Sequence, residues 1–331
     1  MFCKITIALC LTGAIITLSA CSVEVNPGST PTVDPENGSA FNWATIEPNF
    51  PEIDPTEDPE DNRLEPYEWI PDDYDPASEW PLIVFLHAYG WDALELATDI
   101  YGLPQRVNED GFILVAPQGL IDEIGNTFWS ANKTCCDYYG LGQDDHAYLE
   151  NLIAEYVEAY SIDPDQIYVY GSSNGAFMAH AYACGHSSQI AAMVTISGVD
   201  ELDFVACDAQ DPISVLQIHG TADPDVIYNG HPGDDVPKPL MRGYPGAMES
   251  AEHWAERSGC ELVPDEIGTL NLDWMQPGSE TAMYQWSDCD NEVTVEHWAV
   301  EGATHTLCVW DVPNYVENVF GEQTLTWLLA Q

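Results

Sequence analysis

A serine stands between two glycines within QIYVYGSSNGAFM, the stretch Gln166–Met178. Ser173 is the central residue of a G-x-S-x-G pattern that begins at Gly171 and ends at Gly175. An apolar run precedes this pattern and a segment of small residues follows it. A strand, a sharp turn and a helix in that order expose the serine hydroxyl at the end of a sheet. We therefore predict that Ser173, rather than its neighbour Ser172, is a nucleophile.

Two later loops offer the groups that a nucleophilic serine requires. A serine hydroxyl is a weak nucleophile until a base removes its proton, and the base needs a carboxylate that fixes its tautomer. Asp223 follows the predicted strand ISVLQIHG, and His305 follows the predicted strand VTVEHWAV. In proteins whose nucleophile lies in such a strand–turn–helix segment, the acid and then the histidine follow the serine along the chain, as Asp223 and His305 do here. We favour Asp223 as the acid, with Asp225 and Asp200 as alternatives because they also follow strands.

His305 is the preferred base among the nine histidines of the chain. His180 lies inside a predicted helix and His297 inside a predicted strand, so both are expected to be structural. His87 and His219 stand at strand ends, where we expect them to shape loops.

The tetrahedral intermediate of acyl transfer needs N–H donors for its oxyanion. One candidate is the backbone N–H of Asn174, directly after the serine. The other is expected in the loop after the first buried strand, at Tyr89, with Ala88 as the alternative. This chemistry needs neither a metal nor an organic cofactor. The sequence also contains no G-x-G-x-x-G or G-x-x-x-x-G-K-S/T motif, which argues against a dinucleotide-binding protein or a kinase.

Alternating strands and helices are predicted to position these side chains. Strands are predicted over residues 64–70, 81–87, 112–115, 166–170, 191–197, 213–219, 281–286 and 293–300. Helices are predicted over 92–107 (interrupted by Pro104), 145–160, 176–184, 247–257 and 315–329. Fully apolar strands such as PLIVFLH are typical of parallel sheets buried on both faces. The pattern predicts an α/β fold, a mainly parallel sheet with helices on both faces.

Composition narrows the possible partners. The length of 331 residues suits one large α/β domain with appendages. Because 56 acidic residues face 7 basic ones, the formal net charge is -49. Such a surface repels nucleic acid phosphates and anionic lipid headgroups, so we expect no nucleic acid partner.

The N-terminal segment reads as an export signal over residues 1–20. Its apolar run is shorter than the ~20 residues of a membrane-spanning helix. The sequence LSAC, which ends at Cys21, resembles a lipobox, in which the cysteine is lipidated and becomes the mature N-terminus; cleavage without lipidation is the alternative. Residues 21–64 are expected to be a disordered acidic linker, and residues 65–331 the catalytic domain. We expect a cell-surface or outer-membrane lipoprotein, otherwise a secreted protein, that meets a membrane only through this anchor.

Cysteines beyond Cys21 are expected to form disulfides, because exported proteins keep them oxidised. The predicted pairs are Cys184 with Cys207, Cys260 with Cys289, and one of Cys135 and Cys136 with Cys308.

Several stretches together resemble one known family. PLIVFLHAYG, FILVAPQG, IDPDQIYVYGSSNGAFMAHAYAC, IHGTADPDVIYNGH and GATHT, spread over residues 65 to 310, are similar to the secreted esterases that include polyhydroxybutyrate depolymerases, feruloyl esterases and acetylxylan esterases. The resemblance implies an α/β-hydrolase fold with Ser173 as nucleophile, Asp223 as acid and His305 as base. It also places Trp129 and Tyr228 near the substrate.

The chain departs from that family at two places beside the expected site. Ala88 follows His87 where the family usually has glycine, and the residues after the catalytic histidine differ from the usual aromatic-Pro-Gly. The lip that faces the substrate is therefore expected to differ.

These features predict an exported serine carboxylic ester hydrolase that works through an acyl-enzyme. Its expected substrates are feruloyl or acetyl esters of polysaccharides, or short hydroxyalkanoate esters. A serine peptidase or thioesterase of the same fold is one alternative, and a catalytically inactive surface protein that binds glycans is another.

Overall fold

The computed structural model describes residues 63–203, 207, 209–233, 235, 240, 242–272, 278–307 and 319–331. The expected export signal, Cys21 and nearly all of the acidic linker lie outside these residues. At the start of the described chain, Arg63 forms an ion pair with Asp145 and stacks 4.1 Å from the ring centroid of Tyr148. Among the described residues, no helix has both the length and the apolar character needed to span a bilayer.

A nine-stranded sheet carries the fold, in the order β1-β3-β2-β6-β7-β8-β11-β10-β9. The strands are β1 (Tyr67–Trp69), β2 (Trp80–Leu86), β3 (Ile113–Ala116), β6 (Ile162–Ser172), β7 (Ala192–Ile196), β8 (Ser214–Gly220), β9 (Asp265–Leu270), β10 (Thr281–Trp286) and β11 (Val295–Val300). Strands β3, β2, β6, β7, β8 and β11 pair in parallel, while β1, β10 and β9 pair antiparallel at the two edges. The predicted mainly parallel sheet is confirmed.

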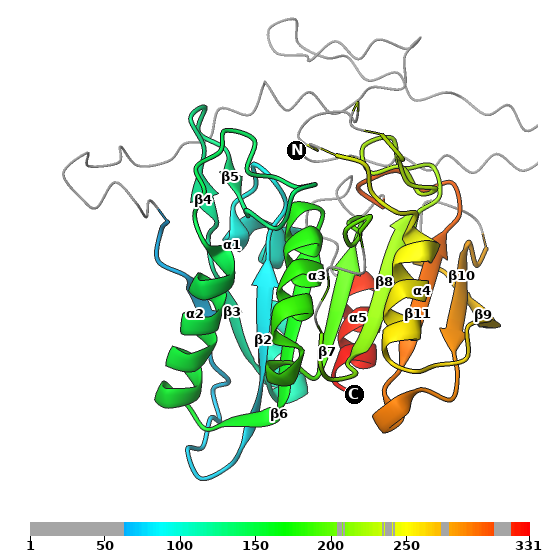
Figure 1. The fold of residues 1–331 in the computed structure, drawn as a ribbon. Helices are drawn as coiled ribbons and strands as arrows, with labels where there is room; N and C mark the ends of the chain where they lie inside the picture. The colour runs from blue at the N-terminus through cyan, green and yellow to red at the C-terminus, as the bar shows by residue number, and fades with distance from the viewer. Residues whose placement is uncertain are drawn as a thin grey trace, which may run out of the picture. The chain divides into compact units, whose positions relative to one another are not determined.

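Helices cover both faces of this sheet. They are α1 (Ala93–Glu95), α2 (Asp145–Ala159), α3 (Asn174–His186), α4 (Ala247–Arg257) and α5 (Val319–Leu328). Figure 1 shows α2, α3 and α4 on one face and α5 on the other. In β2, Leu82 and Val84 belong to the core under α2–α4, whereas Ile83 and Phe85 belong to the core under α5. Because both faces are buried, the strand is apolar at every position.

The helical stretch predicted over residues 92–107, with an interruption at Pro104, is present as short helical pieces separated by a break before Pro104. α1 covers only its first turn, a π-type segment follows over Leu96–Ile100, and a short 3-10 turn covers Pro104–Arg106. Gly102 has a φ of +62°, which ends the first helical stretch. Pro104 begins the next one, at a position where its missing N–H costs nothing, and a second π-type segment follows over Val107–Gly111.

Two sets of strands were not predicted. A hairpin of β4 (Leu120–Ile121) and β5 (Thr127–Phe128) forms within the long loop after β3. Strand β9 lies at the sheet edge and is largely exposed, so its sequence DEIGTL has no apolar face to reveal it.

Three disulfides lie within the described residues. Bonds between Cys184 and Cys207 and between Cys260 and Cys289 confirm two of the predicted pairs. The third prediction was wrong, because Cys135 and Cys136 bond to each other and leave no thiol for Cys308. Cys308 itself lies outside the described residues. Disulfides of this kind fit an oxidising, extracytoplasmic environment.

A buried polar chain links α4 to the sheet through α3. Trp254 Nε1 donates to His180 Nδ1 at 2.9 Å, and His180 Nε2 then donates to Gln217 Oε1 at 2.9 Å. Burial lowers the pKa of His180 to about 3, so its ring is neutral and fits this arrangement. All three side chains are fully buried, so a lost partner leaves a costly unpaired atom.

We predict that Trp254→Phe destabilises the protein by about 1–3 kcal/mol more than Trp286→Phe does, measured by urea unfolding. Trp286 is the matched control because it is equally buried and its Nε1 has no hydrogen-bond partner among the described residues. Both changes shrink an indole to a phenyl ring, so the difference reports the bond to His180. Equal losses in the two variants would contradict the prediction.

Candidate active site

Ser173 lies in a tight turn between β6 and α3. Its φ of +51° and ψ of −115° are rare for a residue with a side chain and cost on the order of 1–3 kcal/mol. Its N–H donates to Ile196 O at 2.7 Å, which attaches the turn to the end of β7. The hydroxyl therefore stands at the carboxyl edge of the sheet, as the sequence predicts.

The glycines on either side let this turn form. A Cβ at Gly171 would lie 2.3 Å from Gly175 O, and a Cβ at Gly175 would lie 2.0 Å from Leu86 O. Both distances are far below any tolerated contact, so only glycine lets β6, α3 and β2 approach this closely.

Ser173, His305 and Asp223 form one hydrogen-bonded series. Ser173 Oγ lies 2.8 Å from His305 Nε2, and His305 Nδ1 lies 2.7 Å from Asp223 Oδ2. The three side chains come from the ends of β6, β11 and β8, and all three residues are buried. Since the carboxylate accepts the Nδ1 proton, Nε2 can accept the proton of the serine.

Asp223 is held as a carboxylate by several donors. Its Oδ1 accepts from the backbone N–H groups of Asp225 and Val226, at 2.8 and 2.9 Å. Its Oδ2 lies 3.1 Å from His219 Nε2, in addition to His305. Burial raises the pKa of Asp223, but the charge of His305 and these hydrogen bonds outweigh it and bring the pKa well below its usual range.

The pairing of Asp223 with His305 lowers the pKa of Asp223 and raises that of His305. Burial alone would lower it, but the charge of Asp223 and the hydrogen bond to it raise the net pKa above the ordinary value of 6.5. Asp225 adds a smaller contribution in the same direction. Hence His305 is a stronger base than a free imidazole.

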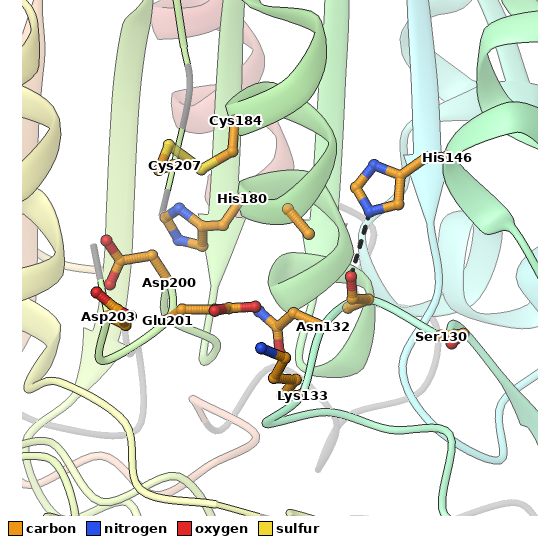
Figure 2. A pocket seen from close by; sticks show the side chains of 12 residues that line it. Ser130, Asn132, Lys133, His146, His180, Cys184, Asp200, Glu201, Asp203 and Cys207 are labelled. Atoms are coloured by element: carbon orange, nitrogen blue, oxygen red, sulfur yellow. Dashed lines mark hydrogen bonds between the residues drawn. A yellow bond between two sulfur atoms is a disulfide. The ribbon is translucent and has the colours of Figure 1, made fainter. Parts of the chain in front are cut away.

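The two alternative acids lie elsewhere. Asp225 donates its backbone N–H to Asp223 Oδ1 at 2.8 Å, whereas it is the carboxylate of Asp223 that accepts from His305. Asp200 pairs with His253 at 2.8 Å, and burial raises its pKa to about 6. Asp200 faces a separate hollow beside Glu201 and Asp203 (Figure 2). The hydrogen-bond geometry therefore favours Asp223.

Ser172, the neighbour of Ser173, points away from this series. Its Oγ lies 2.8 Å from the hydroxyl of Tyr101 in the buried core. The geometry therefore agrees with the choice of Ser173 over Ser172.

The remaining strand-end histidines have structural partners. His87 Nε2 accepts from Gly119 N at 2.8 Å, and its Nδ1 donates to Ala88 O at 2.8 Å. Burial lowers the pKa of His87 to about 4, so it is a neutral bridge between two loops. His219 Nε2 also lies 2.8 Å from Val226 O, which orients it toward Asp223.

Tyr89 and Asn174, the expected oxyanion donors, line one narrow pocket with Ser173 and His305. The Asn174 side chain forms a two-way bridge with the backbone of Trp129: Oδ1 accepts from Trp129 N at 2.7 Å, and Nδ2 donates to Trp129 O at 2.9 Å. Ala88 is not among the residues with positive φ, so alanine fits there without strain.

Trp129 and Tyr228 are not in the described lining of this pocket. Trp129 is fully buried and donates from Nε1 to His87 O at 3.1 Å. The Tyr228 hydroxyl lies 2.9 Å from His297 Nε2. Both residues support the loops around the pocket in this structure.

Some pocket residues were not predicted from the sequence. Phe177, Val226 and Leu240 line the pocket together with Cys135 and Cys136. Each of the three reads in the sequence as an ordinary core residue, so no local signal marks it.

The ligand atoms of Asp223, Asp225 and His305 lie within 4.8 Å of one another, a spacing that a metal ion could use. A metal on this cluster would displace the proton shared between His305 Nδ1 and Asp223 Oδ2. The existing hydrogen bonds therefore fit proton transfer better than metal binding.

No family model matches the chain. A comparison with known proteins finds distant relatives that are named as esterases. Feruloyl esterase B of Piromyces equi is 28% identical over 229 residues, which cover 68% of this chain and 39% of that protein. A bifunctional acetylxylan esterase/xylanase of Neocallimastix patriciarum is 22% identical, over 70% of this chain and 30% of that protein. A probable feruloyl esterase C of Aspergillus niger is 27% identical, over 58% of this chain and 61% of that protein. The chain thus spans less than two thirds of each of these relatives.

Among solved structures, an acetyl xylan esterase from Aspergillus awamori has a similar fold. It superposes with a TM-score of 0.56 at 16% sequence identity and covers 80% of this chain and 93% of that one. This likeness confirms the predicted fold.

We predict that labelling of Ser173 by a fluorophosphonate slows as pH falls through the pKa of His305, because only the neutral imidazole can take the serine proton. Asp223 raises that pKa, so the midpoint lies above 6.5. Asp223→Asn removes the charge, which shifts the midpoint to lower pH and slows labelling on the order of 10⁴-fold. Rates measured by mass spectrometry across pH 5 to 9 (roughly the range in which histidine titrates) test this.

Asp225→Asn is the control for the loss of a nearby charge, since Asp225 raises the pKa of His305 by less than Asp223 does. It should move the midpoint in the same direction by less and leave the plateau rate within a few-fold. A larger effect from Asp225→Asn than from Asp223→Asn would reverse the assignment of the acid.

Proposed function

The chain is a distant relative of the feruloyl esterases and acetylxylan esterases, α/β-hydrolases, and from this premise we propose that it is a serine carboxylic ester hydrolase. The observation that carries the proposal is the hydrogen-bonded series Ser173–His305–Asp223 at the carboxyl edge of the sheet. An inactive glycan-binding protein has no need for this geometry.

In the proposed reaction, Ser173 Oγ attacks the acyl carbon while His305 Nε2 takes the hydroxyl proton. The tetrahedral intermediate collapses, the ester bond breaks, and the alcohol leaves with the proton from His305. Water then attacks the acyl-enzyme, again with His305 as base, and releases the carboxylic acid and free Ser173. Asp223 keeps the imidazole in the required tautomer and stabilises its charged form.

The backbone N–H groups of Tyr89 and Asn174 are proposed to bind the oxyanion. Their positions in the pocket beside Ser173 support this role. The bridge between the Asn174 side chain and Trp129 fixes the first turn of α3, so little reorganisation is needed when charge develops on the substrate. In this proposal Trp129 and Tyr228 act through the loops that they support.

The proposed substrates are carboxylic esters attached to plant polysaccharides. The names of the relatives, feruloyl esterase and acetylxylan esterase, support this class over peptides, thioesters or short hydroxyalkanoate esters. The acidic charge of the chain also favours substrates that are neutral overall.

We propose that the protein acts outside the cytoplasm, attached to a membrane through lipid on Cys21. Three disulfides support export, and LSAC, which ends at Cys21, supports lipidation. We expect Cys21→Ser to move the protein from the membrane fraction to the soluble exported fraction, measured by immunoblotting after expression in a bacterium that processes lipoproteins. The unchanged protein is the control, and an identical distribution of both proteins would refute the anchor.

We predict that the protein hydrolyses p-nitrophenyl acetate and that Ser173→Ala lowers kcat by at least about 10⁴-fold. Ser172→Ala is the matched control, since its hydroxyl bonds to Tyr101, and should retain kcat within a few-fold. Equal, near-background rates in the wild type and Ser173→Ala would refute an esterase.

A further inference from the structure

The pocket beside Ser173 is narrow. Its volume is about 20 Å³, and both polar and apolar residues line it. The polar ones are Tyr89, Ser173, Asn174, Asp225 and His305; the apolar ones, which we call the apolar side, are Cys135, Cys136, Phe177, Val226 and Leu240. The reacting groups therefore face a small apolar space.

The aromatic part of the apolar side has little room to move. Phe177 is fully buried and packs edge-on against Tyr244, with ring centroids 6.4 Å apart. The hydroxyl of Tyr244 accepts from Ile227 N at 3.0 Å, which fixes the ring behind Phe177. A larger acyl group cannot enter by a simple rotation of Phe177.

The disulfide part is fixed as well. Cys135 O accepts from Ala131 N and Asn132 N, both at 3.0 Å, and Cys136 N donates to Trp129 O at 3.2 Å. These bonds fold the loop onto itself and hold Cys135 and Cys136 in the lining of the pocket.

The part of the apolar side that Val226 forms is hydrogen-bonded to Asp223, the proposed catalytic acid. Val226 N donates to Asp223 Oδ1 at 2.9 Å, so the backbone that carries the Val226 side chain cannot shift without disturbing Asp223. Leu240 is nearly fully buried beside it and completes the apolar side.

We infer that this pocket is an acyl-binding pocket that accepts an acetyl group and excludes feruloyl and hydroxybutyryl groups. The inference rests on the proposed function, since it concerns the acyl half of the ester that Ser173 attacks. A space of roughly one water molecule also holds a methyl group. The feruloyl chain adds a double bond and a substituted ring, and the hydroxybutyryl chain adds two carbons and a hydroxyl that the apolar wall leaves unpaired.

The larger hollow in Figure 2 does not provide the missing space. It has a volume of about 370 Å³, but its described lining contains neither Ser173 nor His305. The carboxylates of Asp200, Glu201 and Asp203 line it instead, which disfavours an apolar aromatic acyl group. Within the described residues, the small pocket is therefore the space that we assign to an acyl group bonded to Ser173.

The test is a series of p-nitrophenyl esters that share one leaving group: acetate, butyrate, 3-hydroxybutyrate and ferulate. One added methylene in a fitted pocket costs roughly 10- to 200-fold in kcat/KM. We therefore expect kcat/KM for acetate to exceed that for butyrate and hydroxybutyrate by at least about tenfold, and ferulate to be at background. Ferulate hydrolysis within about tenfold of acetate would overturn the inference.

Two variants test whether the named wall sets this preference. Val226→Ala and Leu240→Ala enlarge the apolar side and should lower the acetate-to-butyrate ratio by about tenfold each, while acetate hydrolysis continues. Leu262→Ala, at an exposed leucine outside the pocket, is the matched control and should leave the ratio unchanged. An unchanged ratio in both pocket variants would overturn the assignment of the wall.

Fluorophosphonate labelling of Ser173 distinguishes a failure of the acyl-pocket inference from a failure of the proposed esterase function. Labelling together with an ester series that has no preference for acetate refutes only the acyl pocket. No labelling and no hydrolysis of any ester refutes the proposed function and the acyl pocket with it.

Discussion

The strained backbone of Ser173 is the constraint on which the surrounding structure depends. A residue with a side chain holds a φ of +51° only when its neighbours leave no alternative. Here β2, β6 and α3 meet so closely that Gly171 and Gly175 have no space for a Cβ. The sheet thus stabilises the turn, and the turn in return presents one hydroxyl to the groups that follow β8 and β11.

Hydrogen bonds from immediate neighbours stabilise the buried carboxylate of this site, in a chain with a net charge of -49. Two backbone N–H groups and two histidines surround the carboxylate of Asp223, so it stays ionised although it is buried. That carboxylate then raises the pKa of His305. The basicity of His305 is therefore set by its immediate partners, and the acidic surface contributes little across solvent.

The sheet, and the places of the proposed catalytic residues at its carboxyl edge, could be predicted because each had a local signal. Apolar runs marked the central strands, and Ser173, Asp223 and His305 each follow one of them in the order that the fold requires. Strand β9 had no such signal, because an exposed edge strand shows no apolar face. The pairing of Cys135 with Cys136 was missed because sequence separation does not decide which thiol lies nearest.

The apolar residues that line the pocket were not predicted either, because they too have no local signal in the sequence. Phe177 and Val226 become neighbours only when α3 and the loop after β8 meet in space, and neither residue differs in type from the core around it. Long-range packing of this kind leaves no trace in local periodicity.

The bridge between Asn174 and Trp129 limits how the loop that contains Trp129 can be exchanged. The same side chain that begins α3 also holds the segment leading to Cys135 and Cys136. Because both bonds go to the backbone of Trp129, a loop grafted in place of residues 129–136 keeps them only if its backbone follows the same path at that residue. The path of this loop and the start of α3 therefore depend on each other, so a redesigned loop has to keep the backbone position of residue 129 or be combined with a change at Asn174.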